Sequence, residues 1–156
     1  MKKKFKWEID GLDNSVSLIY AAKKSLSARL TTLLDSIKIY FEKPSEENLH
    51  QVRISLRRVR YNLELFYSCF DERIFDKFYK RIVKLQDLTG DVRDIDIMKR
   101  NLLQDIDFSY ANLKKIINKF ESKRNVLLEK MNITLFRFTF SKTLKEFLKQ
   151  LDQRGG

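Results

Sequence analysis

The chain has 156 residues, enough for one domain with a hydrophobic core but too few for two comfortable ones. One proline and four glycines supply too few turn signals for an all-β fold, so long helices are expected. Lys and Arg total 32 against 21 Asp and Glu, which gives a net charge of +11. Such a chain attracts polyanions, among them nucleic acids, anionic lipids and phosphate polymers.

Cysteine content and the start of the chain bear on its location. The single Cys69 cannot close an intramolecular disulfide, and no Cys/His cluster has zinc-ligand spacing. The first residues, "MKKKFKWEID", lack the apolar run of a signal peptide, and no segment approaches the roughly 20 apolar residues of a membrane span. We predict a cytoplasmic protein without a metal or cofactor.

Apolar residues recur at three- and four-residue steps along most of the chain, which predicts amphipathic helices. The first helix is expected from about Asn14 to Glu42. Pro44 interrupts the pattern, and Ser45 is the expected N-cap of a second helix that runs to about Phe70.

The second half of the chain continues this pattern. A third helix is expected to end at Gly90, as a left-handed C-cap, and to resume after a short break over 91–106. Two more helices are expected over about 110–131 and 141–151. Short connections between these segments predict an all-α, antiparallel helical bundle that forms a single domain over residues 1–156.

The stretch "HQVRISLRRVRY", residues 50–61, contains the only histidine and four arginines. Four of these cations lie one residue beyond the apolar positions of the second helix and form a stripe beside its buried face. They are His50, Arg53, Arg57 and Arg60. No acid occurs between Gln51 and Asn62, so their own helix does not neutralise them there. Either acids from neighbouring helices (Asp91, Asp94 or Asp96) or an external polyanion supplies the missing negative charge.

Other basic residues follow helical spacing elsewhere. A second stripe runs along the third helix at Arg73, Lys77, Lys80 and Lys84, with Arg81 nearer the core edge, and an exposed face without a partner explains it equally well. In the fifth segment, Arg124 occupies the apolar step between Phe120 and Leu127. An inward arginine must pair, here with Asp94 or Asp96, or line a wet cavity. Arginine forks suit phosphate oxygens, which they bind in bidentate fashion.

Two motifs resemble the CHAD domain, the conserved histidine α-helical domain family. "SEENLHQVRISLRRVRYNLELF" is similar to the family's His-x-x-Arg-x-x-x-Arg-Arg-x-Arg helix, and "VKLQDLTGDVRDIDIM" to its Leu-Gln-x-x-x-Gly-x-x-Arg-Asp-x-Asp segment. The best match spans residues 45–100. The resemblance implies helices around a basic central groove or channel, and binding of inorganic polyphosphate, often at polyphosphate granules.

The resemblance also implies site residues. The positions that match the family's basic ones are His50, Arg53, Arg57, Arg58, Arg60, Lys84 and Arg93, and the acids that match are Asp94 and Asp96, interpreted as partners that orient the arginines. Periodicity adds Arg81 and Arg124. Typical members are longer and contain two related bundles, whereas this chain has one basic helix. A homodimer that rebuilds the channel is therefore a hypothesis.

Four functions are considered. The leading prediction is non-enzymatic binding of polyphosphate. The alternative is a helical DNA- or RNA-binding protein, although most of the twelve Phe residues sit at core-spaced positions and Tyr61 is the main aromatic near the basic stripe. An enzyme is disfavoured, because no Gly-rich phosphate loop or metal-binding constellation accompanies His50. Membrane-surface binding is disfavoured as well, because no basic face is paired with exposed apolar residues.

Overall fold

The computed structural model describes residues 16–104 and 110–152, and within these ranges the regular structure is helical. Its elements are α1 (Leu18–Glu42), α2 (Glu46–Leu65), the short 3-10 helix η1 (Tyr67–Cys69), α3 (Glu72–Gln104), α4 (Tyr110–Thr139) and α5 (Lys142–Asp152). The predicted all-α bundle is confirmed.

Side-chain caps start the helices at the places where the apolar pattern breaks. A cap oxygen that accepts an N–H of the first turn satisfies a donor that has no partner within the helix. The caps and their donors are Ser17 with Tyr20, Ser45 with Asn48, Asp71 with Ile74, and Ser141 with Leu144. The expected N-cap at Ser45, directly after Pro44, is confirmed.

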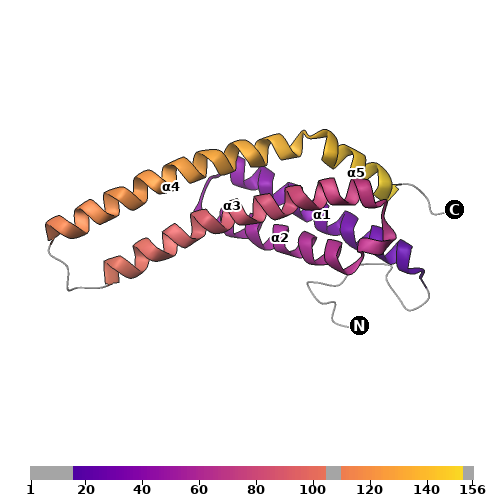
Figure 1. The fold of residues 1–156 in the computed structure, drawn as a ribbon, viewed down its shortest axis with the longest axis horizontal. Coiled ribbons are helices and arrows are strands. Elements are labelled where there is room, and N and C mark those ends of the chain that lie inside the picture. Colours follow the sequence, from indigo (N-terminus) through magenta and orange to yellow (C-terminus); the bar gives the residue numbers. More distant parts are fainter. Residues whose placement is uncertain (1–15, 105–109, 153–156) are drawn as a thin grey trace.

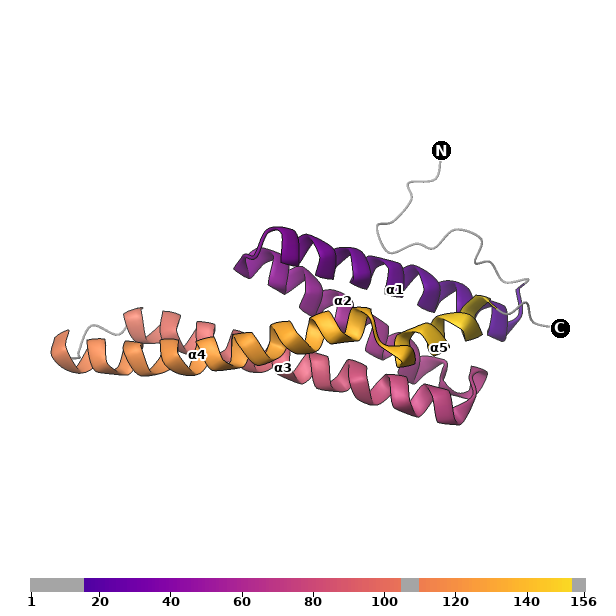
Figure 2. The ribbon, with the colours of Figure 1, turned by 90° about the horizontal axis from the view of Figure 1, so that it is seen from above.

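The helices pack as two antiparallel hairpins (Figures 1 and 2). Helices α1 and α2 form one, and α3 and α4 form the other, with α3 also packed against α2. Helix α5 continues beyond α4 after a bend and packs against α1 and α3. The end of α3 and the start of α4 extend beyond the other helices as a two-helix arm.

Aromatic rings from three helices meet in the core. Phe78 of α3 stacks on Phe147 of α5 with ring centroids 4.1 Å apart, and Phe138 of α4 lies 6.0 Å from Phe78. All three side chains are fully buried. Burial of one such ring stabilises a fold by roughly 1.5–3 kcal/mol, so these contacts tie α3, α4 and α5 together.

The first helix begins later than its apolar pattern indicated. Helix α1 starts at Leu18 behind the Ser17 cap, and Asn14 lies outside the described residues. Ile19 fits the apolar spacing of this helix but is 49% exposed. The buried stripe instead begins at Ala22, one turn further along, where α1 is covered by the rest of the bundle.

The second helix ends at Leu65, so the predicted end at Phe70 is wrong. The chain tightens into η1 and then extends at Phe70, whose φ and ψ are −126° and 159°. Phe70 precedes the Asp71 cap of α3 and packs against Phe75, four residues after that cap, with centroids 6.5 Å apart. This contact is a hydrophobic staple, which fixes the angle at which the chain enters α3.

Helix α3 is continuous, so the predicted C-cap and break at Gly90 are wrong. Gly90 lies inside the helix, and its φ is not in the left-handed range. The reason is packing: Leu85, Leu88, Val92 and Ile95 carry one buried stripe straight past the glycine. Burial of that stripe outweighs the roughly 1 kcal/mol that a mid-helix glycine costs. The last predicted residues of this segment, 105–106, lie outside the described chain.

Helix α4 extends to Thr139, beyond the predicted end near Met131. Leu135 and Phe138 continue the buried stripe of Met131 and keep the helix packed on the bundle. In the arm, the apolar stripe of α4 is only half-buried, because α3 alone covers it there. Its half-buried members are Leu113, Ile117, Phe120 and Leu127.

Candidate functional site

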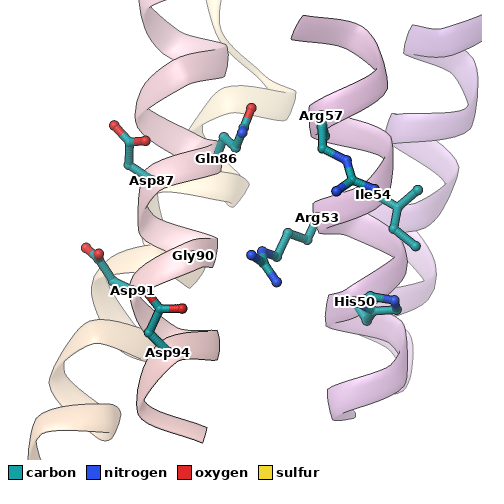
Figure 3. A pocket seen from close by; sticks show the side chains of 9 residues that line it. All are labelled: His50, Arg53, Ile54, Arg57, Gln86, Asp87, Gly90, Asp91 and Asp94. Carbon is teal, nitrogen blue, oxygen red and sulfur yellow. The ribbon is translucent and has the colours of Figure 1, made fainter. Parts of the chain in front are cut away.

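A cleft of about 330 Å³ lies between α2 and α3 (Figure 3). One wall comes from α2, with His50, Arg53, Ile54 and Arg57, and the other from α3, with Gln86, Asp87, Gly90, Asp91 and Asp94. The position of the cationic wall follows from the sequence of α2. Leu49, Val52, Leu56 and Val59 are buried, so the residues that follow each of them lie at the edge of the helix contact.

Arg53 and Arg57 are the cations that the cleft leaves without partners. Within the described residues, neither guanidinium makes a hydrogen bond or an ion pair within 4.0 Å. Arg53 reaches across the cleft toward α3 at the level of Gly90, and Arg57 lies one turn further along α2 (Figure 3). Neutralisation of this pair by Asp91, Asp94 or Asp96, one of the two interpretations of the sequence, is therefore not observed in this part of the chain.

The α3 wall carries carboxylates, so the cleft is mixed in charge. Asp87 and Asp91 point away from α2, while Gln86 and Asp94 flank the bare backbone at Gly90 (Figure 3). The side-chain oxygen of Gln86 is buried and has no hydrogen-bond partner among the described residues. The predicted basic channel therefore stays a prediction, and the free positive charge is concentrated on the α2 side.

One end of the α2–α3 contact is closed by Glu64. Its carboxylate accepts hydrogen bonds from Arg60 Nε at 2.8 Å and from the Tyr79 hydroxyl at 2.7 Å. These bonds lower the pKa of Glu64, and the bond to Glu64 raises the pKa of Tyr79. Arg60 is thus neutralised on its own helix by an acid just past the acid-free stretch, which corrects the expectation that the whole stripe lacks such relief.

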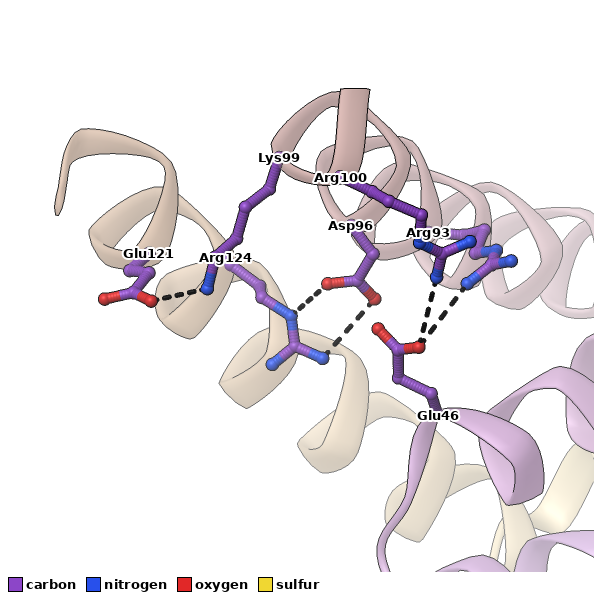
Figure 4. A network of polar contacts seen from close by, with 7 residues as sticks. All are labelled: Glu46, Arg93, Asp96, Lys99, Arg100, Glu121 and Arg124. Carbon is purple, nitrogen blue, oxygen red and sulfur yellow. Dashed lines mark hydrogen bonds and ion pairs between the residues drawn. The ribbon is translucent and has the colours of Figure 1, made fainter. Parts of the chain in front are cut away.

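The other end is closed by Glu46 in the first turn of α2 (Figure 4). Its carboxylate pairs with Arg93 Nη1 at 3.8 Å and with Arg100 Nη2 at 3.4 Å, both on α3. Arg93, a predicted phosphate contact, is therefore held by an acid from within the chain. Glu46 and Glu64 are 18 residues apart on α2, about 27 Å along the helix, and the unpaired arginines lie between them.

Arg124 points inward, as its spacing predicted, and binds Asp96 in bidentate fashion (Figure 4). The Asp96 side chain is 7% exposed and that of Arg124 24%. The hydrogen bond to Asp96 raises the pKa of Arg124, which stays charged. The same two residues line a second, larger cleft with Lys99, Arg100 and other residues, so Arg124 both forms the expected ion pair and borders an open cleft.

Three further predicted site residues lie away from the α2–α3 cleft. Arg58 is exposed and sits about 100° around α2 from Arg57. Arg81 is exposed rather than near the core edge and sits about 140° around α3 from Gln86. Lys84 lines a separate pocket with Lys80 and Lys130. The two basic stripes of the sequence therefore occupy different surfaces, and only the first faces the cleft.

Sequence reasoning missed most of the α3 wall. Gln86 was noted only as part of a family motif, and Gly90 was interpreted as a helix C-cap. In the structure they lie one turn apart on the surface that faces Arg53. The i, i+4 spacing of Gln86, Gly90 and Asp94 could have indicated a shared face once α3 was recognised as continuous. The pairing of Glu46 with Arg93 and Arg100 spans two helices, and no spacing within one helix reveals it.

Comparison with known protein families identifies the family of this chain. The family model of the CHAD domain matches residues 12–104, more than half of the chain. The protein belongs to the CHAD domain family. The matched segment contains α1, α2 and α3, so both walls of the cleft belong to the CHAD part, whereas α4 and α5 lie beyond it. Searches of the curated proteins and of the solved structures give no significant match.

Two further properties of the CHAD chain concern other kinds of site. In residues 16–104 and 110–152, no group of three or more His, Cys, Asp or Glu side chains is placed to hold a metal ion. Over the same ranges, no helix combines the length and the apolar character that a membrane crossing requires.

Proposed function

We propose that this protein binds inorganic polyphosphate without catalysing a reaction, and that Arg53 and Arg57 are its principal contacts. The observation that carries the proposal is the pair of guanidinium groups that face one cleft without an acidic partner in the described chain. The CHAD family is associated with polyphosphate binding in general, and its domain is generally a binding module.

The two arginine side chains suit a phosphate ligand better than a monatomic anion such as chloride. A guanidinium presents parallel N–H donors that match two phosphate oxygens, and each charge-assisted hydrogen bond contributes roughly 1.5–3 kcal/mol. Arg53 and Arg57 are one turn apart, about 6 Å along α2, so they can hold neighbouring phosphates of one chain. His50 lies one turn before Arg53 and extends the row of donors.

The other predicted contacts take secondary places in this proposal. Arg60 and Arg93 flank the cleft but are engaged by Glu64 and Glu46, so they are not among the first contacts. Arg58, Arg81 and Lys84 add to the positive field of the molecule rather than to the first contacts, and Arg124 is engaged by Asp96. Asp96 orients Arg124, and Asp94 limits how far a phosphate can move along the α3 wall.

Single-stranded nucleic acid is the second candidate ligand. Tyr61 lies one turn beyond Arg57 and is 59% exposed, so a base could stack on its ring. A competition experiment separates the two ligands: a labelled polyphosphate is displaced by unlabelled polyphosphate or by single-stranded DNA of equal phosphate number at fixed salt. We expect polyphosphate to compete at a lower concentration, and stronger competition by DNA would contradict the proposal.

A homodimer forms part of the same proposal, as does recruitment to polyphosphate granules. One chain supplies one basic helix, and a two-fold pair of chains would place two such helices along one ligand. Light scattering at micromolar protein concentration, with and without polyphosphate, measures the mass. We expect a dimer, and a monomeric mass under both conditions would contradict the pairing.

A further inference from the structure

We infer that Gly90 is an opening in the α3 wall that admits a slender phosphate chain and sets the width of ligand that the cleft accepts. This inference rests on the proposed binding of polyphosphate in the cleft. Gly90 lies in mid-helix, where a glycine costs roughly 0.5–1 kcal/mol relative to alanine. A residue that weakens its own helix calls for a reason outside helix formation.

The packing of the protein does not explain why position 90 is a glycine. A glycine inside a helix commonly lets another part of the backbone approach closely. In that case a side chain at the glycine position would collide with the neighbouring backbone. A Cβ built on Gly90 meets no atom within 4 Å. The fold therefore tolerates a side chain at this position, and the open space beside Gly90 belongs to the cleft.

The surroundings of Gly90 indicate what uses this space. Gln86 and Asp94, one turn to either side, flank the bare backbone, and Arg53 reaches toward the same level from α2 (Figure 3). The inferred position of a phosphate is between the Arg53 guanidinium and the α3 backbone, where residue 90 has no side chain to obstruct it. Any other residue at position 90 would add a side chain to the α3 wall and narrow the space in front of Arg53.

The width of the opening bears on the class of ligand. A volume of about 330 Å³ lies at the small end of ligand pockets and suits a few units of an unbranched chain. A nucleic-acid duplex carries its phosphates on the outside of a wide helix and would reach only the rim. The cleft thereby favours a narrow polyphosphate chain over a duplex.

Two substitutions at Gly90 test the inference. Gly90→Ala adds one methyl group and removes a helix-weakening glycine, so it should raise the melting temperature and leave the affinity for a short polyphosphate within about threefold of wild type. Gly90→Gln should keep the melting temperature at or above wild type and lower that affinity at least tenfold, because its side chain fills the opening. Ser122→Gln adds the same side chain on an exposed position of α4 and should change neither quantity.

The outcomes separate this inference from the proposed function. If Gly90→Gln binds polyphosphate like wild type while Arg53→Ala/Arg57→Ala does not, the opening is not used and the cleft remains the site. If Gly90→Ala lowers the melting temperature, the glycine serves the fold and the inference is wrong. A wild-type protein that binds no polyphosphate overturns both. Weak rim binding of duplex DNA, measured in parallel, should be the same for wild type and Gly90→Gln.

Discussion

Arg53 and Arg57 lie one turn apart on α2, face the same cleft, and have no acidic partner in the described chain. Their neighbours along the α2–α3 contact differ in this respect. Arg60 is bound by Glu64, and Arg93 and Arg100 are bound by Glu46. The protein thus neutralises the cations at both ends of the contact and leaves the middle pair available to a ligand.

The shape of the guanidinium group should matter as well as its charge. Replacement of both residues, Arg53→Lys/Arg57→Lys, keeps two positive charges but removes the planar fork that binds two oxygens at once. We expect affinity for polyphosphate to fall about tenfold while the slope of log affinity against log salt stays the same. Titrations at several salt concentrations measure both quantities. Unchanged affinity would show that the cleft senses charge alone.

The Arg124–Asp96 pair should contribute more to stability than the exposed Lys99–Glu121 pair on the same two helices. Asp96→Asn leaves a half-buried arginine without its carboxylate, and we expect a loss of about 2 kcal/mol, between the values for exposed and fully buried pairs. Glu121→Gln, in which 48% of the glutamate side chain is exposed, should cost less than about 1 kcal/mol. Urea unfolding of the two variants gives the comparison, and equal losses would mean that burial does not distinguish the pairs.

Glu64 should make the stability depend on pH in the acid range. Hydrogen bonds from Tyr79 and Arg60 lower its pKa in the folded protein, so its contribution is fully present above the unfolded pKa of about 4.3 and is lost as the pH falls through the folded value. We expect Glu64→Gln to be slightly less stable than wild type at neutral pH and to lose this difference as the carboxylate of wild type is protonated. A difference that persists unchanged at low pH would contradict the assigned cause.

Much of the fold could be predicted because it depends on periodicity within single helices. The buried stripe of α2 and the inward position of Arg124 both follow from three- and four-residue spacing. The helix ends were harder to predict. Phe70 continues the apolar spacing of α2, but its contact with Phe75 of the next helix draws it out of α2.

Gly90 shows the limit of local signals most clearly. A glycine after an apolar stripe is a common helix end, yet the burial of Val92 and Ile95 on the far side keeps α3 continuous. The site itself was predictable on α2, where four arginines occur in a stretch without acids, and not on α3, where the wall depends on how two helices face each other. Among the predicted contacts, Arg60 differs from Arg53 and Arg57 by an acid four residues further along the sequence, and in the structure this acid, Glu64, binds it.

The most direct test of the central claim compares two double variants in one binding assay. Arg53→Ala/Arg57→Ala removes the cleft pair, and Lys119→Ala/Lys123→Ala removes two exposed cations with the same i, i+4 spacing on α4. With a short labelled polyphosphate at fixed salt, we expect the first to lose about 100-fold in affinity, about 2.7 kcal/mol, and the second no more than about threefold. Equal losses in two folded variants would contradict the cleft as the binding site.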